Sequence, residues 1–276
     1  AANPDFPAEL GGPPALRRFV IAIVDEPTTK LAALTSGELD FAGINPAHAE
    51  FVRNNPRLEV VSYPLLLTYG IVFNTRVAPF NDVSIRRGIS QTLDRTEIVH
   101  GFLYGFGSEA YGPVPPEIPS AVSIPHDASP PDSTRALASR KLEFELLTVG
   151  SGEAALEQMI QSQLGRAGIK VTIRQLELTA FLDRVNSRHP EFGAAVMGTS
   201  GDLGLGYLST LGELAGIQVP RDRIEAQQVF HDSLPVAFLY HARGVQGMNR
   251  RMRNVRMDIR GELATVHDWR DDPVNP

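Results

Sequence analysis

The sequence contains no cysteine among its 276 residues. This absence excludes disulfide bonds, thiolate nucleophiles, iron–sulfur clusters and cysteine-based zinc sites. The sequence also lacks any run of about eighteen apolar residues, so no transmembrane helix is predicted. Basic side chains are not in excess, because 26 Lys and Arg stand against 32 Asp and Glu. A protein that neutralises phosphates normally presents a basic face, so no nucleic acid is expected as a partner.

Patterns that signal catalysis or metal binding are absent as well. The seven histidines are scattered, and none forms an HExxH motif or a helix-face pair with a nearby acid. Ser200 in GTSGD does not fit the G-x-S-x-G pattern of a serine nucleophile, so a tight turn after a buried strand is favoured. Residues 150–152, Gly-Ser-Gly, could hold an anion at a helix N-terminus, but a capped turn is favoured. We therefore expect a non-enzymatic protein without a metal or cofactor.

The first third of the sequence predicts a β-α-β arrangement. Residues 1–15 are rich in Pro, Gly and Ala and predict an irregular lead-in. Residues 16–24 and 38–44 predict two strands around a helix that Asp25 caps and Gly37 ends. Such a unit is typical of an α/β domain with some parallel strand pairing. The next elements are expected to be a short helix at 46–56, strands at 57–63 and 67–75, and helices at 82–92 and 94–104.

The second half of the chain repeats the α/β pattern after a proline-rich region. Strands are predicted at 141–149, 169–177 and 192–199, helices at 151–168, 178–187 and after Tyr207, and a strand-turn-strand at 234–248. The expected organisation is a lead-in at 1–15, a first α/β sublobe at 16–104, a proline-rich crossing loop at 105–135, a second α/β lobe at 136–243, and a C-terminal return segment and tail at 244–276.

A charged cluster lies in the stretch FNTRVAPFNDVSIRRGISQTLDR, residues 73–95. Asp82 and Asp94 stand where N-caps accept backbone N–H bonds, and Arg86 follows Asp82 by one helical turn on the same face. This pattern predicts two successive helix starts with an ion pair, and it does not place a nucleophile beside a base. A structural role for the cluster is therefore favoured over a catalytic one.

The same stretch, extended to FNTRVAPFNDVSIRRGISQTLDRTEIV, resembles a segment of the family 5 extracellular solute-binding proteins. These are the peptide, dipeptide and nickel receptors of ABC importers. The preceding stretch, from NPDF through DEPTTKLAALTSGELDFAGI, is similar to the family as well. GPVPP, AGIKVTIRQLE and LPVAFLYHARGVQGM then follow in the family's order. The resemblance thus covers most of the chain.

This resemblance implies an α/β fold of the type II periplasmic-binding-protein kind, with two lobes of mixed sheets flanked by helices. The solute would be captured by closure of the lobes about a hinge. The family's peptide receptors bind the ligand α-amino group with an Asp whose place corresponds to Asp202. The resemblance therefore implies a ligand site at Asp202 with Gly201 and Tyr207. The Trp that commonly precedes this Asp is absent here, and Gly-Leu-Gly replaces the residues that usually follow it.

The resemblance also implies a structural joint that carries the chain between lobes. Its residues are Asn74, Asp82, Arg86, Asp94 and Arg95.

Compared with the family, the architecture is expected to be incomplete. Family members have a long N-terminal part before the region that this sequence resembles, so the chain would be a fragment, a split half or a degenerate relative. Two functions stay open. One is an extracytoplasmic receptor, peripheral to the membrane, that binds a peptide-like or small polar solute and serves an ABC permease. The other is a binding-protein fold reused as a structural or docking subunit of a membrane protein complex.

Overall fold

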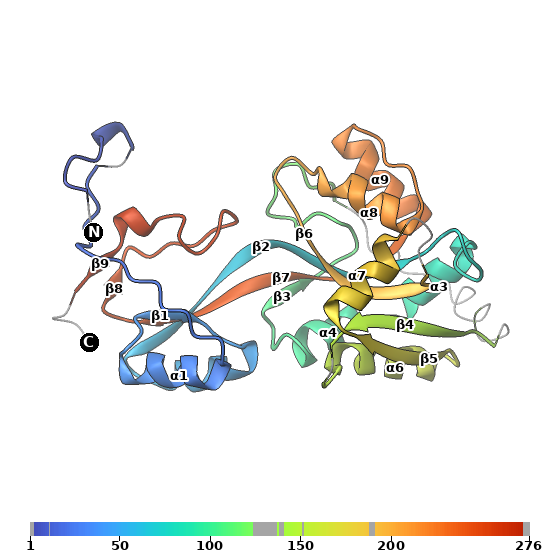
Figure 1. Cartoon of the computed structure of the whole chain (residues 1–276), viewed down its shortest axis with the longest axis horizontal. Helices are drawn as coiled ribbons and strands as arrows, with labels where there is room; N and C mark the ends of the chain where they lie inside the picture. Colours follow the sequence, from blue (N-terminus) through green and yellow to red (C-terminus); the bar gives the residue numbers. More distant parts are fainter. Residues whose placement is uncertain are drawn as a thin grey trace. The chain divides into compact units, whose positions relative to one another are not determined.

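The computed structural model describes residues 3–10, 12–123, 137, 141–150, 152–187 and 191–272. The chain forms two compact units, shown as a ribbon in Figure 1. Unit 1 comprises Ala1–Leu65 and Arg243–Pro276, and unit 2 comprises Leu66–Ala242. The chain therefore passes from one unit to the other twice, once in each of two long strands, β2 (Leu58–Phe73) and β7 (Val236–Asn249).

The predicted divisions on either side of the proline-rich region at 105–135 fall within unit 2, whereas the predicted division at 243/244 lies one residue from the second passage between the units. The described part of that region lies within unit 2, where Val114 and Ile118 are buried. Proline content indicates irregular backbone, but it does not show whether the segment is packed, because packing depends on contacts with distant parts of the chain. The rest of the region, 124–135, lies outside the described residues.

Unit 1 is small, and its described residues include two separate hydrophobic clusters. One joins Leu34, Val52 and Leu58, and the other joins Met248, Met252 and Trp269. Its elements are the 3-10 turns η1 (Ala8–Leu10), η2 (Pro46–His48) and η3 (Val266–Asp268), the helices α1 (Pro27–Ser36) and α2 (Ala49–Arg53), the strands β1 (Phe41–Gly43), β8 (Met252–Arg253) and β9 (Arg270–Asp271), and parts of β2 and β7.

The β-α-β unit predicted for this region is wrong in two respects. Residues 16–24 form no strand, and β1 pairs antiparallel with β7, with Phe41 opposite Met248. Helix α1 does form and ends at Gly37, whose φ of +89° is the left-handed conformation that glycine adopts readily. Its N-cap is Glu26, whose carboxylate accepts the N–H groups of Thr28 and Thr29, and not the predicted Asp25. The apolar run at 19–24 was compatible with a strand, but a strand also requires a partner for its backbone.

The structure also corrects two other strand predictions. The predicted strand-turn-strand at 234–248 is the single strand β7, and the two strands predicted at 57–63 and 67–75 are the single strand β2. A Cβ at Gly244 would lie 2.2 Å from Cζ of Tyr63, and a Cβ at Gly247 would lie 2.4 Å from Cδ2 of Leu34. These glycines therefore permit close packing against the strand and do not mark a turn.

Unit 2 contains a mixed sheet with helices, as the resemblance implied. Strand β6 (Ala194–Ser200) pairs antiparallel with β2 and parallel with β4 (Glu143–Val149), and β4 pairs parallel with β5 (Lys170–Leu176). A short strand, β3 (Gly107–Glu109), pairs antiparallel with β7. The helices are α3 (Val83–Thr92), α4 (Arg95–Gly101), α6 (Ala155–Arg166), α7 (Leu178–Asn186), α8 (Tyr207–Ala215) and α9 (Arg223–Ser233).

One continuous hydrophobic core joins the sheet and helices of unit 2. It includes Ile71 and Phe73 from β2, Ile89 from α3, Leu146 from β4 and Ile160 from α6, all with no exposed surface. The predicted N-caps of the two successive helices are confirmed: Asp82 accepts the N–H of Ser84, and Asp94 that of Glu97, both at 2.8 Å. In the described part of both units, no helix has the length and apolar character needed to cross a bilayer.

Candidate ligand-binding site

The three residues predicted to bind a ligand lie together in unit 2, where the chain leaves β6 and enters α8. The N–H of Gly201 donates to the carbonyl of Leu66 at 2.6 Å, which fixes the chain beside β2. The Tyr207 ring packs on Gly201, where a Cβ would lie 3.0 Å from Cε1 of the tyrosine. The Tyr207 hydroxyl donates to the carbonyl of Pro113 at 2.9 Å. Asp202 stands between Gly201 and Tyr207 in the loop.

The Asp202 carboxylate is exposed but held by the backbone. Its Oδ1 accepts the N–H of Gly206 at 3.3 Å, and its Oδ2 accepts the N–H of Tyr207 at 3.2 Å. Slight burial raises the pKa of Asp202, but hydrogen bonds from backbone N–H groups of residues 204–207 outweigh it, so the pKa lies below its ordinary value. The loop therefore presents a permanent negative charge to solvent at the N-terminus of α8, where it also complements the helix dipole.

A cavity of about 280 Å³ lies in the same unit. Its lining includes Glu109, Tyr111, Val114, Gln227 and His241. Pro113 lies between two lining residues, Gly112 and Val114, and its carbonyl links this part of the chain to Tyr207 beside the Asp202 loop. This oxygen accepts from Tyr207 and, at 3.2 Å, from the hydroxyl of Thr68.

One residue of the cavity wall, His241, is paired with the buried Thr68. Thr68 and His241 are 4% and 5% exposed, and Oγ1 of Thr68 lies 2.8 Å from Nδ1 of His241. Because the single hydroxyl proton of Thr68 is given to Pro113, His241 is the donor in this second bond, which places its proton on Nδ1. Burial lowers the pKa of His241 to about 4, so the ring is neutral at pH 7.

The acidic side of the cavity is Glu109. Tyr111 donates its hydroxyl to Oε2 of Glu109 at 2.6 Å, and Thr96 donates to Oε1. Burial, followed by the hydrogen bond to Glu109, raises the pKa of Tyr111 to about 12 and keeps it protonated. The guanidinium of Arg95 lies 4.6 Å from the centre of the Tyr111 ring. The cavity thus offers hydroxyl, carboxylate and imidazole groups beside apolar side chains, a composition suited to a small polar ligand.

The residues predicted as a structural joint all lie within unit 2, away from the two passages between units in β2 and β7. Their role as a joint between lobes stays a prediction. Asn74 is 1% exposed, donates from Nδ2 to the carbonyl of Phe192 at 3.0 Å, and receives the N–H of Arg76 at 3.2 Å. It fastens the end of β2 to the residues before β6.

The sequence predicted an ion pair between Arg86 and Asp82. In the structure, the Arg86 guanidinium donates hydrogen bonds to backbone carbonyls. Its Nη1 donates to Phe80 at 2.6 Å, its Nε donates to Leu234 at 2.9 Å, and its Nη2 donates to Ser233. Asp82 raises the pKa of Arg86, but burial lowers it more. The arginine therefore ties the start of α3 to the end of α9.

Arg95 is also buried. Its Nε donates to the carbonyls of Ala110 and Phe238 at 2.9 and 2.8 Å, and its Nη1 donates to Ser90 and Leu93 at 2.9 and 3.2 Å. Burial lowers its pKa to about 10, which leaves it charged at pH 7. Five guanidinium N–H donors reach several backbone carbonyls at once, a task for which the planar fork of arginine is suited.

Sequence reasoning missed the residues of the cavity. The lining residues Glu109, Tyr111, Gln227 and His241 come from three segments of the chain and form no local motif. The one available signal was His241 itself, a titratable residue inside an apolar strand. Among the described residues, no group of three His, Asp or Glu is placed to hold a metal ion. His126 and His189 lie outside the described residues.

The family model for bacterial extracellular solute-binding proteins, family 5 (middle), matches residues 1–213. The chain belongs to this family. It is 31% identical over 216 residues to the probable di/tripeptide-binding protein 5 of Pseudomonas aeruginosa, which covers 74% of this chain and 40% of that protein. It is 26% identical over 191 residues to the probable D,D-dipeptide-binding periplasmic protein DdpA of Escherichia coli, covering 66% of this chain and 36% of that one.

Solved structures show the same fold. The oligopeptide-binding protein AppA of Bacillus subtilis, in complex with a nonapeptide, matches 90% of this chain and 59% of its own at 19% identity and a TM-score of 0.70. DppA of Helicobacter pylori, in complex with the peptide STSA, matches 90% and 56% at 17% identity and a TM-score of 0.72. The incomplete binding-protein architecture implied by the sequence is thus confirmed, since the chain spans about 40% of the length of its curated relatives.

Proposed function

We propose that this chain is the ligand-contacting part of an extracytoplasmic receptor that binds a peptide and delivers it to an ABC permease. Membership of the family and the relatives named for di- and tripeptides support this function. The observation that carries the proposal is the exposed, ionised Asp202 carboxylate, held by backbone N–H groups beside Tyr207. Peripheral association with the membrane and closure of two lobes about the ligand belong to the same proposal.

The chemistry of Asp202 favours a ligand with a free amino group. An ammonium group is a three-way hydrogen-bond donor, and a carboxylate accepts such bonds more strongly than a neutral oxygen does. The backbone bonds already fix the carboxylate, so little side-chain entropy is lost when the ligand binds. The neighbouring cavity, with Tyr111 and His241 in its wall, supplies further hydrogen-bonding groups for the peptide body.

The test is calorimetric titration of the 276-residue protein with the dipeptide Ala-Ala and with N-acetyl-Ala-Ala. Ala-Ala should bind and the acetylated peptide should bind at least tenfold more weakly, about 1.4 kcal/mol, because it has no charged amino group. Asp202→Asn should remove this preference, while its one side-chain oxygen can still accept one of the two backbone bonds.

Asp222→Asn is the matched control. Asp222 is also an exposed Asp that accepts backbone N–H bonds at the start of a helix, α9, and it lines neither the cavity nor the Asp202 loop. Its substitution removes the same charge and should leave the discrimination between the two peptides unchanged. Binding that is equal for both peptides, or equal in the wild type and Asp202→Asn, would contradict the proposal.

The alternative function, a structural or docking subunit of a membrane protein complex, receives no support from the comparisons. The family and the relatives reported above are binding proteins. This agrees with the expectation of a non-enzymatic protein.

A further inference from the structure

A second cavity, of about 410 Å³, lies in unit 1 and is unrelated to the proposed peptide site. It forms a groove between residues 19–24 and strand β1. Its lining includes Val20, Ala22 and Val24 on one side and Phe41, Gly43 and Gln246 on the other. The groove is therefore bordered along one side by the edge of a sheet.

One edge of strand β1 pairs with β7, and the other edge is open in the described part of the chain. On its paired edge, Ile44 donates its N–H to Val245 at 3.0 Å, and Asn249 donates to Asp40 at 2.7 Å. Bonding to the partner alternates along an antiparallel strand, so the N–H and C=O groups of Phe41 and Gly43 face the opposite edge. No backbone hydrogen bond joins these groups to any other described residue. An edge of this kind is a template for another strand.

The opposite side of the groove is a segment of chain that has strand-like composition without strand pairing. Across the described stretch 13–25, no backbone hydrogen bond is made to the described residues of either unit. Val20 is 63% exposed, Ile21 73% and Ile23 88%. Phe19 anchors the segment, with its ring centre 6.0 Å from that of Phe41. Three large apolar side chains within four residues, exposed to this degree, are costly in water unless something covers them.

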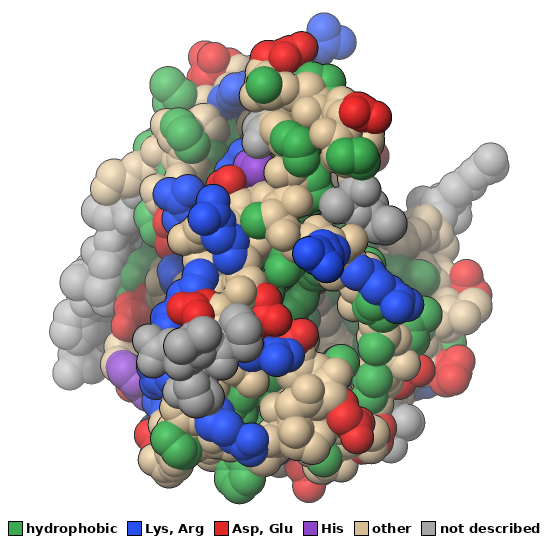
Figure 2. All heavy atoms as spheres, turned by 90° about the vertical axis from the view of Figure 1, so that its left-hand side faces the viewer, with side chains coloured by type: hydrophobic (Ala, Val, Ile, Leu, Met, Phe, Trp, Pro, Cys, Tyr) green, Lys and Arg blue, Asp and Glu red, His purple; other side chains and the backbone are tan. Residues whose placement is uncertain are grey.

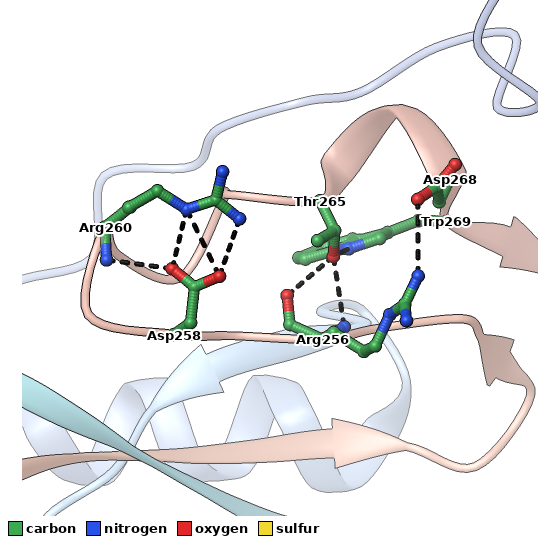
Figure 3. Close-up of polar contacts among 6 residues, drawn as sticks. All are labelled: Arg256, Asp258, Arg260, Thr265, Asp268 and Trp269. Atoms are coloured by element: carbon green, nitrogen blue, oxygen red, sulfur yellow. Dashed lines mark hydrogen bonds and ion pairs between the residues drawn. The ribbon is translucent and has the colours of Figure 1, made fainter. Parts of the chain in front are cut away.

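The third side of the groove is a fixed loop that carries Leu263. Figure 3 shows the contacts that hold it. Thr265 donates its hydroxyl to the carbonyl of Arg256 at 2.6 Å and receives both the N–H of Arg256 and the indole N–H of Trp269 at 3.1 Å. The loop is therefore held in place by both backbone and side-chain bonds, and the groove has a preformed wall.

The groove lining includes a buried hydrogen-bond acceptor, Oε1 of Gln246. Gln246 is 6% exposed, and its Oε1 has no hydrogen-bond partner among the described residues. Its Nε2 lies 3.5 Å from the Tyr63 hydroxyl, which itself donates to Glu262 at 2.7 Å. A buried acceptor left without a donor costs roughly 1–3 kcal/mol. An incoming N–H group at the groove would remove this cost.

We propose that the groove receives a β-strand from polypeptide outside these 276 residues, inserted between residues 19–24 and β1. One strand residue occupies roughly 160 Å³, from a rise of about 3.3 Å, a strand spacing of about 4.8 Å and a sheet spacing of about 10 Å. The groove therefore holds about three residues, which matches the three-residue length of β1. The inserted strand pairs with Phe41 and Gly43 on one edge and with the unpaired segment on the other.

The length of the relatives favours this occupant over a second copy of the chain. Matched relatives are far longer, since this chain spans 40% of the Pseudomonas protein, so the family carries polypeptide that could supply a strand. The charge of the groove does not favour a charged partner, because its lining holds one basic residue, Lys30, and one acidic residue, Glu262. Figure 2 shows acidic and basic side chains intermingled on one face of the molecule, with hydrophobic side chains exposed among them. The strand is expected to have small β-branched residues facing the groove.

The probe is a fluorescein-labelled octapeptide of alternating Val and Thr, added to the 276-residue protein and followed by fluorescence anisotropy. Binding is expected, together with at least tenfold slower hydrogen exchange at the Phe41 and Gly43 amides. Val20→Lys places a charge in the groove, and Gly43→Pro removes an outward N–H that β7 does not use. Each should weaken binding at least tenfold. Ile23→Lys, a matched change at a position that does not line the groove, should leave binding within twofold.

Three results would overturn the proposal. The first is no binding of the octapeptide, and the second is equal binding to Val20→Lys and Ile23→Lys. The third is a concentration-dependent dimer, seen by sedimentation, that Val20→Lys dissociates, because it would make a second copy the occupant. The Ala-Ala titration that tests the peptide site is read out separately, so either proposal can fail alone.

Discussion

The two units differ in how completely their apolar side chains are buried and their buried polar groups are hydrogen-bonded. In unit 2, Ile71 and Ile89 have no exposed surface and belong to a core that connects the sheet and its helices. In unit 1, Ile21 and Ile23 are 73% and 88% exposed, and the described core residues include two small, separate clusters. The same residue type therefore has opposite environments in the two units. Apolar character alone does not bury a side chain; a neighbouring element must be present to cover it.

Buried polar groups in the two units also differ in their hydrogen bonding. Arg95 in unit 2 is buried with hydrogen bonds from its nitrogens to several carbonyls, whereas Gln246 in unit 1 is buried with its Oε1 unpaired. A satisfied buried group stabilises one arrangement of its surroundings, while an unsatisfied one indicates that a partner is missing. Unit 2 thus has the features of a finished fold, and unit 1 has those of a fold that accepts a further strand.

The largest expected effect comes from the same substitution made in each core. Leu146→Ala should lower the free energy of unfolding of unit 2 by about 4 kcal/mol, because it leaves a cavity inside a continuous core. Leu34→Ala should lower that of unit 1 by about 2 kcal/mol, because its small cluster can collapse more easily. Urea titrations measure both. Fluorescence of Trp269, the single tryptophan, follows unit 1, and helical circular dichroism mainly follows unit 2. Equal losses in the two units would remove the contrast between their cores.

A pH effect of intermediate size is expected from unit 2. The pKa of His241 is lowered by burial from about 6.5 to about 4, so between these values the unfolded chain binds the proton and the folded chain does not. Stability is therefore fully present above about pH 6.5 and falls by about 3 kcal/mol as the pH drops to 4. Urea unfolding across this range should show the slope.

The matched variants are His241→Gln, which should flatten that slope, and His100→Gln, which should not. His100 is an exposed histidine in the same unit. A slope that survives in His241→Gln would assign the pH dependence to other groups.

The smallest effect separates two neighbouring acids in unit 1. Glu26→Ala should speed hydrogen exchange at the Thr28 and Thr29 amides, because the Glu26 carboxylate accepts both. Asp25→Ala, which alters the cap predicted from sequence, should leave both amides unchanged. Amide exchange measured by NMR compares the two variants directly. Faster exchange in Asp25→Ala alone would show that Asp25, and not Glu26, is the N-cap of α1.

The sequence predicted most elements of unit 2, and its resemblance to the family implied three candidate ligand residues, whose binding role stays a prediction. Helix starts at Asp82 and Asp94 follow from short-range capping, and the buried strand before Asp202 follows from its apolar run. Capping and propensity act over a few residues, so a local pattern can reveal them. The cavity near His241 could not be predicted in this way, because its wall is assembled from segments far apart in the chain.

By itself, the sequence determined the family, the mixed α/β character and the absence of any cysteine chemistry, since each depends on residue type and local order. Only the tertiary structure decided that Arg86 and Arg95 bond to carbonyls, that β2 and β7 are single strands, and that residues 16–24 remain unpaired. The reason is physical. A backbone or side-chain polar group takes whichever partner packing brings within about 3 Å, and that partner is set by distant parts of the chain.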